Sequence, residues 1–322
     1  MIVVHDIHTH NIYSNCCSDR GATTVAYLQK EAALGMRIFG LSNHIWDERV
    51  KGGSYWYRTQ SIVRNEEAKN AFSKASPSLK VLFGAETEYY ACCDMLGMSV
   101  EGAEHFDYLL IPHSHLHMRN EVMADFPEIL EARAEVRARL AETFPLFSEA
   151  QLNAMAATLK ESDLLQLYPE LEIDCKTHVN RAMIEGFLSL LENADFLKLV
   201  GKLPISIAHS FSPCGVPHAQ KNAYLELISD ETFAECYRKA ARLGVLIELN
   251  VGAIREVGSE LAQNHLMRAY AIAKNEGCQF TFGTDSHSIK GLEGISFANE
   301  IANYLRLRSS DIAEFVRDGV IE

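Results

Sequence analysis

The stretch Ile2-Val3-Val4-His5-Asp6-Ile7-His8-Thr9-His10 decides the fold, because it reads as a β-strand that ends in two histidines. Later apolar runs end in the same way, with a histidine or an aspartate where the run stops. These runs occupy residues 41–44, 109–115, 205–209 and 280–287. Metal ligands and catalytic groups of α/β barrels lie at the C-terminal ends of parallel strands. The pattern therefore predicts a metal site assembled from the whole chain.

Short β-rich runs alternate with longer stretches of helical period along most of the chain. Strands are predicted at residues 2–8, 38–41, 81–86, 108–112, 205–208, 246–250 and 280–283. Helices are predicted at residues 24–34, 59–73, 181–191, 230–243, 260–275 and 296–307. Alternating strands and helices indicate an α/β fold with a parallel sheet covered by helices. Seven strands favour a barrel or near-barrel over a doubly wound sheet.

Residues 118–178 interrupt this alternation with a long, acidic insert of helical pattern and no predicted strand. Ile129, Ala132, Val136 and Leu140 fall on one face of the insert. A long insert between two barrel strands is often functional, so we interpret it as a lid or side wall, with packing on the barrel exterior as the alternative. No repeat or linker-like stretch divides the chain, so we expect residues 1–322 to form a single domain.

The composition limits the kinds of molecule that the protein is expected to bind. The 322 residues are 48% hydrophobic, which is enough for a large core, and carry a net charge of −13. Bulk electrostatics therefore exclude nucleic-acid binding, although local cations such as metal ions could attract an anionic substrate. The eight cysteines show no C-x-x-C spacing, no apolar run is long enough to span a bilayer, and the N-terminus lacks a basic signal region. We expect a cytoplasmic enzyme with reduced cysteines and no membrane partner; the oligomeric state is not predicted.

The first candidate ligands are the pair of histidines that close the N-terminal strand. Residues i and i+2 of a strand point to the same side, so His8 and His10 could share one cation. Two such histidines alone are more often surface residues. The residues at the other strand ends are what make a metal site the better interpretation. Glu86 ends the run at residues 81–86; its carboxylate could bridge two ions, with Glu88 as the competitor for that role.

The remaining candidates follow later strands. His113, His115 and His117 alternate and share a face, and we favour His115, then His113. His209 follows an apolar run and precedes an irregular loop. Asp285 and His287 repeat the i, i+2 arrangement. A set of imidazoles and carboxylates without a thiolate majority suits Zn, Mn or Fe(II) better than Ca or Mg.

In this order, the strand-end motifs resemble those of the PHP family (polymerase and histidinol phosphatase). The resemblance rests on residues 8–10, 42–44, 84–86, 112–115, 208–210 and 283–287. It implies a distorted (βα)7 barrel that holds two or three divalent metal ions. By this resemblance the first metal is held by His8, His10, Glu86 and Asp285; the second by Glu86, His115 and His209; and the third by His44 and His287.

The sequence departs from the family pattern at the third metal. Six residues after His10 the family usually has another histidine, and here the residue is Cys16. A Cys16 thiolate, Asn15 or Asp19 could substitute, or the third site is weak. The family's usual Thr-Asp-His is Ser42-Asn43-His44 here, so a carboxylate that would support a ligand is missing.

The stretch Glu248-Leu249-Asn250-Val251-Gly252-Ala253-Ile254-Arg255 is similar to a loop of the histidinol-phosphate phosphatase branch, with the glycine offset by one. The resemblance implies hydrolysis of a phosphate monoester, with L-histidinol phosphate as the leading substrate and a hydroxide shared by two metals as the nucleophile. The implied catalytic residues are Glu86, Asp285, His209 and Arg255. Arg255 would also bind the phosphate, and weaker phosphate candidates are Arg20, Lys176 and Arg181.

Other functions remain as alternatives. One is hydrolysis of another small phosphate ester, such as a nucleotide or a sugar phosphate, by the same kind of site. A metal-dependent amidohydrolase also begins with two histidines on a barrel strand, but the ending Asp285-Ser286-His287 fits the PHP pattern better. A non-catalytic PHP module is disfavoured because the first two predicted metal sites retain all their ligands.

Overall fold

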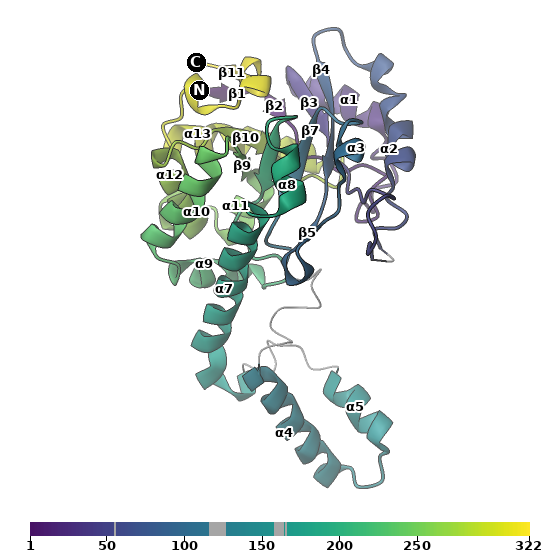
Figure 1. Cartoon of the computed structure of the whole chain (residues 1–322), viewed down its shortest axis with the longest axis vertical. Coiled ribbons are helices and arrows are strands. Elements are labelled where there is room, and N and C mark those ends of the chain that lie inside the picture. The colour runs from purple at the N-terminus through teal and green to yellow at the C-terminus, as the bar shows by residue number, and fades with distance from the viewer. Residues whose placement is uncertain (55, 116–126, 158–163, 165) are drawn as a thin grey trace.

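The computed structural model describes residues 1–54, 56–115, 127–157, 164 and 166–322 (Figure 1). Within these residues, seven parallel strands form one sheet in the order β10-β9-β8-β7-β4-β3-β2. They are β2 (His5–Asp6), β3 (Ile38–Leu41), β4 (Lys80–Glu86), β7 (Tyr108–Pro112), β8 (Ile205–Ala208), β9 (Leu246–Asn250) and β10 (Phe280–Gly283). The predicted strands are therefore confirmed almost to the residue, with one exception.

The exception is the N-terminal stretch, which we predicted as one strand over residues 2–8. It forms two short strands, because the chain changes pairing partner at Val4. β1 (Ile2–Val3) pairs antiparallel with β11 (Val320–Ile321), whereas β2 pairs in parallel with β3. The Val4 amide donates to Gly319 O at 2.8 Å between the two strands. The N-terminal residues thus join the chain's end to the base of the sheet.

The edge strands β2 and β10 meet and nearly close the sheet. Beyond the paired residues, Ile7 N donates to Phe282 O at 3.1 Å and Asp285 N donates to His8 O at 2.8 Å. Thr9 and Ser286 form a further parallel bridge. The fold is a distorted (βα)7 barrel, as predicted, and its closure places the ends of β2 and β10 side by side.

Helices cover the outside of the barrel. Those that correspond to predicted helices are α1 (Thr24–Ala33), α2 (Ile62–Lys69), α7 (Glu172–Leu190), α10 (Asp230–Arg242), α12 (His265–Asn275) and α13 (Ala298–Tyr304). The predicted starts at residues 59 and 260 were too early, whereas the predicted start at residue 181 was too late, because α7 begins at Glu172 within the predicted insert. Ser61 Oγ accepts the Arg64 amide and Asn264 Oδ1 accepts the Leu266 amide, so these side chains cap the helices just before Ile62 and His265.

Further helices were not predicted. They are α3 (Val100–Ala103), α8 (Ala194–Leu199), α9 (His218–Glu226) and α11 (Val251–Val257). Short strands β5 (Tyr89–Tyr90) and β6 (Met95–Leu96) form a separate hairpin. Among the described residues, no helix is both long and apolar enough to cross a membrane.

The lower part of the barrel interior is filled by Tyr108. Its ring lies against Gly84, where an added Cβ would be 2.2 Å from the ring, and its hydroxyl donates to Ile7 O at 2.5 Å. Glycine is required at residue 84 because the ring occupies the space of a side chain. Two residues further along the same strand, Glu86 also points inward. The filled base leaves the polar side chains at the C-terminal end.

The insert forms a small core of its own. α4 (Pro127–Thr143) and α5 (Glu149–Ala157) extend away from the barrel, and α7 leads from the insert back to it (Figure 1). Ala132, Val136 and Leu164 pack with Cys175 of α7, and Leu140 packs against them. This cluster uses the predicted apolar face, although the side chain of Ile129 lies outside the described part of the structure. The role as a lid or side wall stays a prediction.

Candidate metal centre

Four donor atoms from three strand ends converge at the carboxyl end of the barrel. The Nε2 atoms of His8 and His10 are 3.0 Å apart. Each lies 3.2–3.4 Å from Oε2 of Glu86 and from Oδ1 of Asp285. Ligand atoms around a tetrahedral Zn²⁺ with bonds of 2.0–2.1 Å are about 3.3 Å apart. We call these four residues the first pocket. The donor atoms of His8, His10 and Glu86 all lie within 4.8 Å of one another, as binding of one metal ion requires, and Asp285 Oδ1 borders both histidines.

The orientation of the two imidazoles in the first pocket supports this fit. His8 Nδ1 donates to Glu248 Oε1 at 2.7 Å, because a carboxylate can only accept, and this leaves an Nε2 lone pair in the neutral ring. His10 Nδ1 lies 3.2 Å from Ser14 Oγ, and its Nε2 also faces the pocket. Two buried Nε2 lone pairs at 3.0 Å repel each other unless a cation or proton lies between them.

Glu86 divides its two oxygens between two groups of histidines. Oε2 faces the first pocket and also lies 3.1 Å from His44 Nδ1. Oε1 lies 3.1 Å from His209 Nε2 and 3.8 Å from His115 Nε2. Burial opposes ionisation, but the His44 and His8 imidazoles hold the pKa of Glu86 well below its usual range. An ionised carboxylate with one oxygen on each side has the geometry of a bridging ligand.

A second pair of imidazoles faces the other side of Glu86. The Nε2 atoms of His115 and His209 are 3.1 Å apart. With Glu86 they form the second pocket. The sulfur of Cys214 also lies here, and its donor atom and those of both histidines are all within 4.8 Å of one another. Burial raises the pKa of the Cys214 thiol, but the hydrogen bond with His115 and charge on His209 outweigh burial and lower it.

The structure distinguishes between Glu86 and Glu88, the two candidates for a bridging carboxylate. Glu88 lies behind His115: its Oε1 accepts from His115 Nδ1, and it also accepts from the Tyr57 hydroxyl at 2.8 Å. Glu88 therefore orients an imidazole, as Glu248 does for His8, and only Glu86 has an oxygen facing each pocket.

The three alternating histidines also have separate positions. His115 reaches the second pocket. His113 is buried against α7, where its Nδ1 donates to Met183 O at 3.0 Å and its Nε2 accepts the Phe211 amide at 3.0 Å. With both ring nitrogens hydrogen-bonded in this way, His113 holds the loop after β8. His117 lies outside the described residues.

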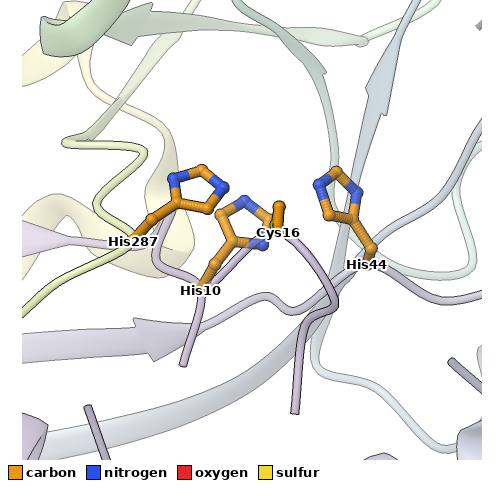
Figure 2. Close-up of side chains that lie close together, drawn as sticks. All are labelled: His10, Cys16, His44 and His287. Carbon is orange, nitrogen blue, oxygen red and sulfur yellow. The ribbon is translucent and has the colours of Figure 1, made fainter. Parts of the chain in front are cut away.

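A third group brings Cys16 to three histidines. The donor atoms of His10, Cys16, His44 and His287 lie within 4.8 Å of one another, and we call this group the third pocket. Figure 2 shows these side chains around one space, contributed by the segments that follow β2, β3 and β10. The sequence predicted Cys16, His44 and His287 here; His10 lies between the first and third pockets.

The other substitutes for the missing histidine are engaged elsewhere. Asn15 Nδ2 donates to Trp56 O and to Thr59 Oγ1, both at 2.8 Å. Asp19 accepts the amides of Gly21 and Ile289. Of the three candidates, the structure brings only Cys16 to the histidines. Burial, with the charges of Glu86 and Asp285, raises the pKa of its thiol, so a nearby cation is what would favour its thiolate.

Asn43, which stands where the family has an aspartate, still contacts a ligand indirectly. Ser14 Oγ donates to Asn43 Oδ1 at 2.9 Å and lies 3.2 Å from His10 Nδ1. Asn43 is also fixed by Asn11, whose amide donates to its Oδ1 at 2.9 Å. Ser14 therefore links the Asn43 side chain to His10.

The backbone is strained where the strands deliver these ligands. His209 and Asp285 have positive φ angles of 30° and 56°, and Phe211 has 60°. Such conformations cost non-glycine residues about 1–3 kcal/mol each and concentrate at functional sites. Here the turn after β10 directs Asp285 inward, and the turn after β8 directs His209 toward His115.

Arg255 lies on the exposed surface of α11, where we had predicted a loop. The segment is helical because Asn250 Oδ1 accepts the Ala253 amide at 2.8 Å and caps the helix. An added Cβ on Gly252 would lie 3.9 Å from Asp285 Cβ, so the start of α11 borders the first pocket. The Arg255 guanidinium stacks 4.9 Å from the centre of the Phe297 ring.

The weaker phosphate candidates do not join these groups. Lys176 Nζ pairs with Glu172 at 2.5 Å on α7 and lies over the Tyr224 ring. Arg181 is exposed and lines a surface pocket with residues that include Ser229, which precedes α10, and Thr232 of α10. Arg20 is exposed in the turn before α1.

The sequence did not assign a role to Cys214, Glu248 or Ser14. Cys214 had a signal, because it lies five residues after His209 in the loop already identified as irregular. Glu248 was noted only as part of a motif, although its place on β9 puts it inside the barrel. No spacing rule identifies Ser14.

The fold and the site define the class of the protein: a distorted (βα)7 barrel with clustered histidines and carboxylates able to bind metal ions at its carboxyl end. No protein-family model and no curated protein matches the sequence.

Solved structures nevertheless share the fold. One is a histidinol phosphate phosphatase from Lactococcus lactis subsp. lactis, complexed with zinc, L-histidinol and phosphate. It has a TM-score of 0.53 and 14% identity, over 96% of this chain and 95% of that one. Another is a putative histidinol phosphatase from Listeria monocytogenes, with a TM-score of 0.54 and 14% identity, over 92% and 99%. The chain therefore has the fold of histidinol phosphate phosphatases, as the PHP resemblance implied.

Proposed function

We propose that the protein is a metal-dependent phosphate monoester hydrolase whose substrate is L-histidinol phosphate. The observation that carries the proposal is the pair of facing imidazoles on each side of one buried carboxylate, Glu86. The similarity in fold to a phosphatase bound to zinc, L-histidinol and phosphate supports the choice of substrate.

The proposed ligands follow the three pockets. His8, His10, Glu86 and Asp285 would hold one ion, Glu86, His115 and His209 a second, and Cys16, His44 and His287 a third. Zn, Mn and Fe(II) suit this mixed set of donors. When bound, such ions lower the pKa of water and neutralise phosphoryl oxygens, which is the chemistry that ester hydrolysis requires.

The protein's own groups fix the geometry and the charge. Glu86 sets the spacing of the first two pockets, while Glu248 and Glu88 fix the tautomer and ring orientation of His8 and His115. With the imidazoles neutral, the carboxylates of Glu86 and Asp285 would repel a phosphate, so substrate binding depends on the cations they hold. His209 completes the proposed catalytic set with Glu86, Asp285 and Arg255.

Arg255 is the proposed phosphate-binding cation. A guanidinium can donate two parallel hydrogen bonds to a phosphate. Stacking on Phe297 restricts the Arg255 side chain beside the start of α11, which borders the first pocket. Arg20, Lys176 and Arg181 remain weaker candidates. We also propose a cytoplasmic location, because all eight cysteines are free.

The test is phosphate release by protein loaded with Zn²⁺ or Mn²⁺, with Glu86→Gln as the inactive control. The substrates are L-histidinol phosphate, a nucleoside monophosphate and a sugar phosphate. We expect the highest kcat/KM on L-histidinol phosphate. If only another ester is hydrolysed, the result would support a phosphate monoester hydrolase and contradict L-histidinol phosphate as its substrate. Metal-loaded protein that releases phosphate from none of them would contradict the proposal.

A further inference from the structure

The second pocket contains a donor that the PHP resemblance did not supply. Cys214 Sγ lies within 4.8 Å of donor atoms of both His115 and His209, whose Nε2 atoms face each other at 3.1 Å. On the same side, Glu86 Oε1 is 3.1 Å from His209 Nε2. The pocket therefore gathers two nitrogens and one sulfur, and the Glu86 oxygen borders the two nitrogens.

The loop that carries Cys214 is fixed by its backbone. The Cys214 amide donates to Ser114 O at 3.3 Å and to Ser212 O at 2.8 Å. The Phe211 amide donates to His113 Nε2 at 3.0 Å. Both outside contacts come from the segment that follows β7, which also carries His115. The two strand ends are thereby held together, and the sulfur is placed with the ligands.

Side-chain packing holds the same loop from the other side. Phe211 is completely buried, and its ring centre lies 5.1 Å from Phe187 and 5.0 Å from Phe233. This packing stabilises the positive φ of Phe211. The position of Cys214 thus follows from a packed and hydrogen-bonded turn.

Independently of the cysteine, the facing histidines of the second pocket repel each other unless a cation or a proton lies between them. His115 Nδ1 donates to Glu88, so its Nε2 carries a lone pair in the neutral ring. His209 Nδ1 lies 3.5 Å from Ser114 Oγ, which leaves its Nε2 toward His115 and Glu86. Thiolate, imidazole and carboxylate are the donors that Zn²⁺ takes in four-coordinate sites, and thiolate favours such softer ions over Mn²⁺.

We propose that Cys214 binds the ion of the second pocket through its thiolate, as the fourth ligand beside Glu86, His115 and His209. The proposal rests on the metal centre of the proposed function. On binding, the Cys214 Sγ–H bond breaks, the sulfur lone pair binds the ion, and the proton passes to solvent. The second and third pockets then each contain one cysteine, whereas the first contains none.

The test replaces zinc by Co²⁺, whose bond to a thiolate produces a charge-transfer absorption in the near ultraviolet. The Cys16→Ser variant is used as the background, so that a sulfur from the third pocket cannot contribute. Cys214→Ser is then added. The matched control is Cys17→Ser in the same background, because the Cys17 thiol is next to the site but is directed to His287 O at 3.1 Å. Bound cobalt is counted by elemental analysis.

We expect the near-ultraviolet band in Cys16→Ser and in the Cys17→Ser control, and its loss when Cys214→Ser is added. Visible cobalt absorption from the first pocket should persist, which also shows that the double variant is folded. Cobalt uptake without a band that depends on Cys214 would overturn this inference and leave the proposed function standing. No cobalt uptake by any variant or by the unaltered chain would overturn both.

As a second measurement, Zn²⁺ should protect Cys214 from alkylation in the unaltered chain while Cys92, which is exposed, reacts at the same rate with and without metal. Equal alkylation of Cys214 in both conditions would contradict the proposal. This result does not depend on a variant that folds.

Discussion

The first and third pockets share His10 but differ in burial and in agreement with the family pattern. The side chains of His8, His10 and Glu86 are at most 1% exposed, and Asp285 is 27% exposed. In the third pocket, the His287 side chain is 36% exposed, and Cys16 is a surface residue whose thiol is partly buried. The departures from the family pattern, at Cys16 and Asn43, both concern the third pocket or the residues that support it.

This difference shows where the barrel tolerates substitution. In the first pocket both histidines lie within 3.4 Å of Glu86 and of Asp285, and a change in Glu86 would disturb two pockets at once. The third pocket is the more exposed of the two, so we expect a substitution there to disturb the barrel interior less. We therefore expect substitutions to reduce metal binding and activity most at Glu86 and least in the third pocket.

The largest effect should follow from Glu86→Gln, which removes the charge shared by the first and second pockets. We expect loss of at least one bound ion and a fall in kcat/KM of about 10³-fold or more, since metal ions supply several kcal/mol of charge stabilisation. The measurements are metal content and phosphate release. Glu67→Gln, on the exposed surface of α2, is the control. Unchanged metal content in Glu86→Gln would show that Glu86 is not a metal ligand.

A smaller effect, a loss of metal affinity, should follow from Glu248→Gln, because this substitution weakens the hydrogen bond that orients His8. Replacing the partners of metal-bound histidines typically costs about 10–100-fold in metal affinity. We expect this loss for the first pocket alone, measured by competition with a chelator. Glu88→Gln should give the same loss for the second pocket. If both variants weaken the same ion, the separation of the two pockets is wrong.

Arg255→Ala tests the phosphate contact beside the first pocket. Hydrogen bonds to charged groups contribute about 1.5–3 kcal/mol, so we expect kcat/KM to fall about tenfold or more with metal content unchanged. Steady-state kinetics on L-histidinol phosphate provide the measurement. Arg242→Ala, on the exposed surface of α10, is the matched control and should leave the kinetics unchanged. Equal effects from the two variants would exclude the assignment of Arg255.

The smallest effect should come from Cys16→Ser, because it concerns only the third pocket. We expect loss of one ion and less than about a tenfold fall in kcat, since the groups around Glu86 are untouched. Metal analysis and kinetics on the same sample decide this. Unchanged metal content would show that Cys16 is not a ligand, and complete inactivation would contradict the ranking of the pockets.

The sequence predicted the barrel because its strands are short apolar runs with clear ends, as at residues 205–208 and 246–250. It predicted for the same reason that the candidate ligands lie close together, since strand ends meet in a parallel barrel. It could not choose between Glu86 and Glu88, which share a face until β4 ends at Glu86 and the chain turns away. The partnership of Glu248 with His8 spans 240 residues and depends on barrel closure. Cys214 depends on a turn whose positive φ angles leave no mark in the residue types.

The most direct test of the account is anomalous X-ray scattering at the zinc edge from crystals of the zinc-loaded protein. The account predicts one zinc bound by His8 and His10 and another by His115 and His209, on opposite sides of Glu86 and about 3.5–4 Å apart, as in other two-metal sites. Zinc-loaded crystals with no anomalous peak beside Glu86 would contradict the claim that these strand ends form a metal centre.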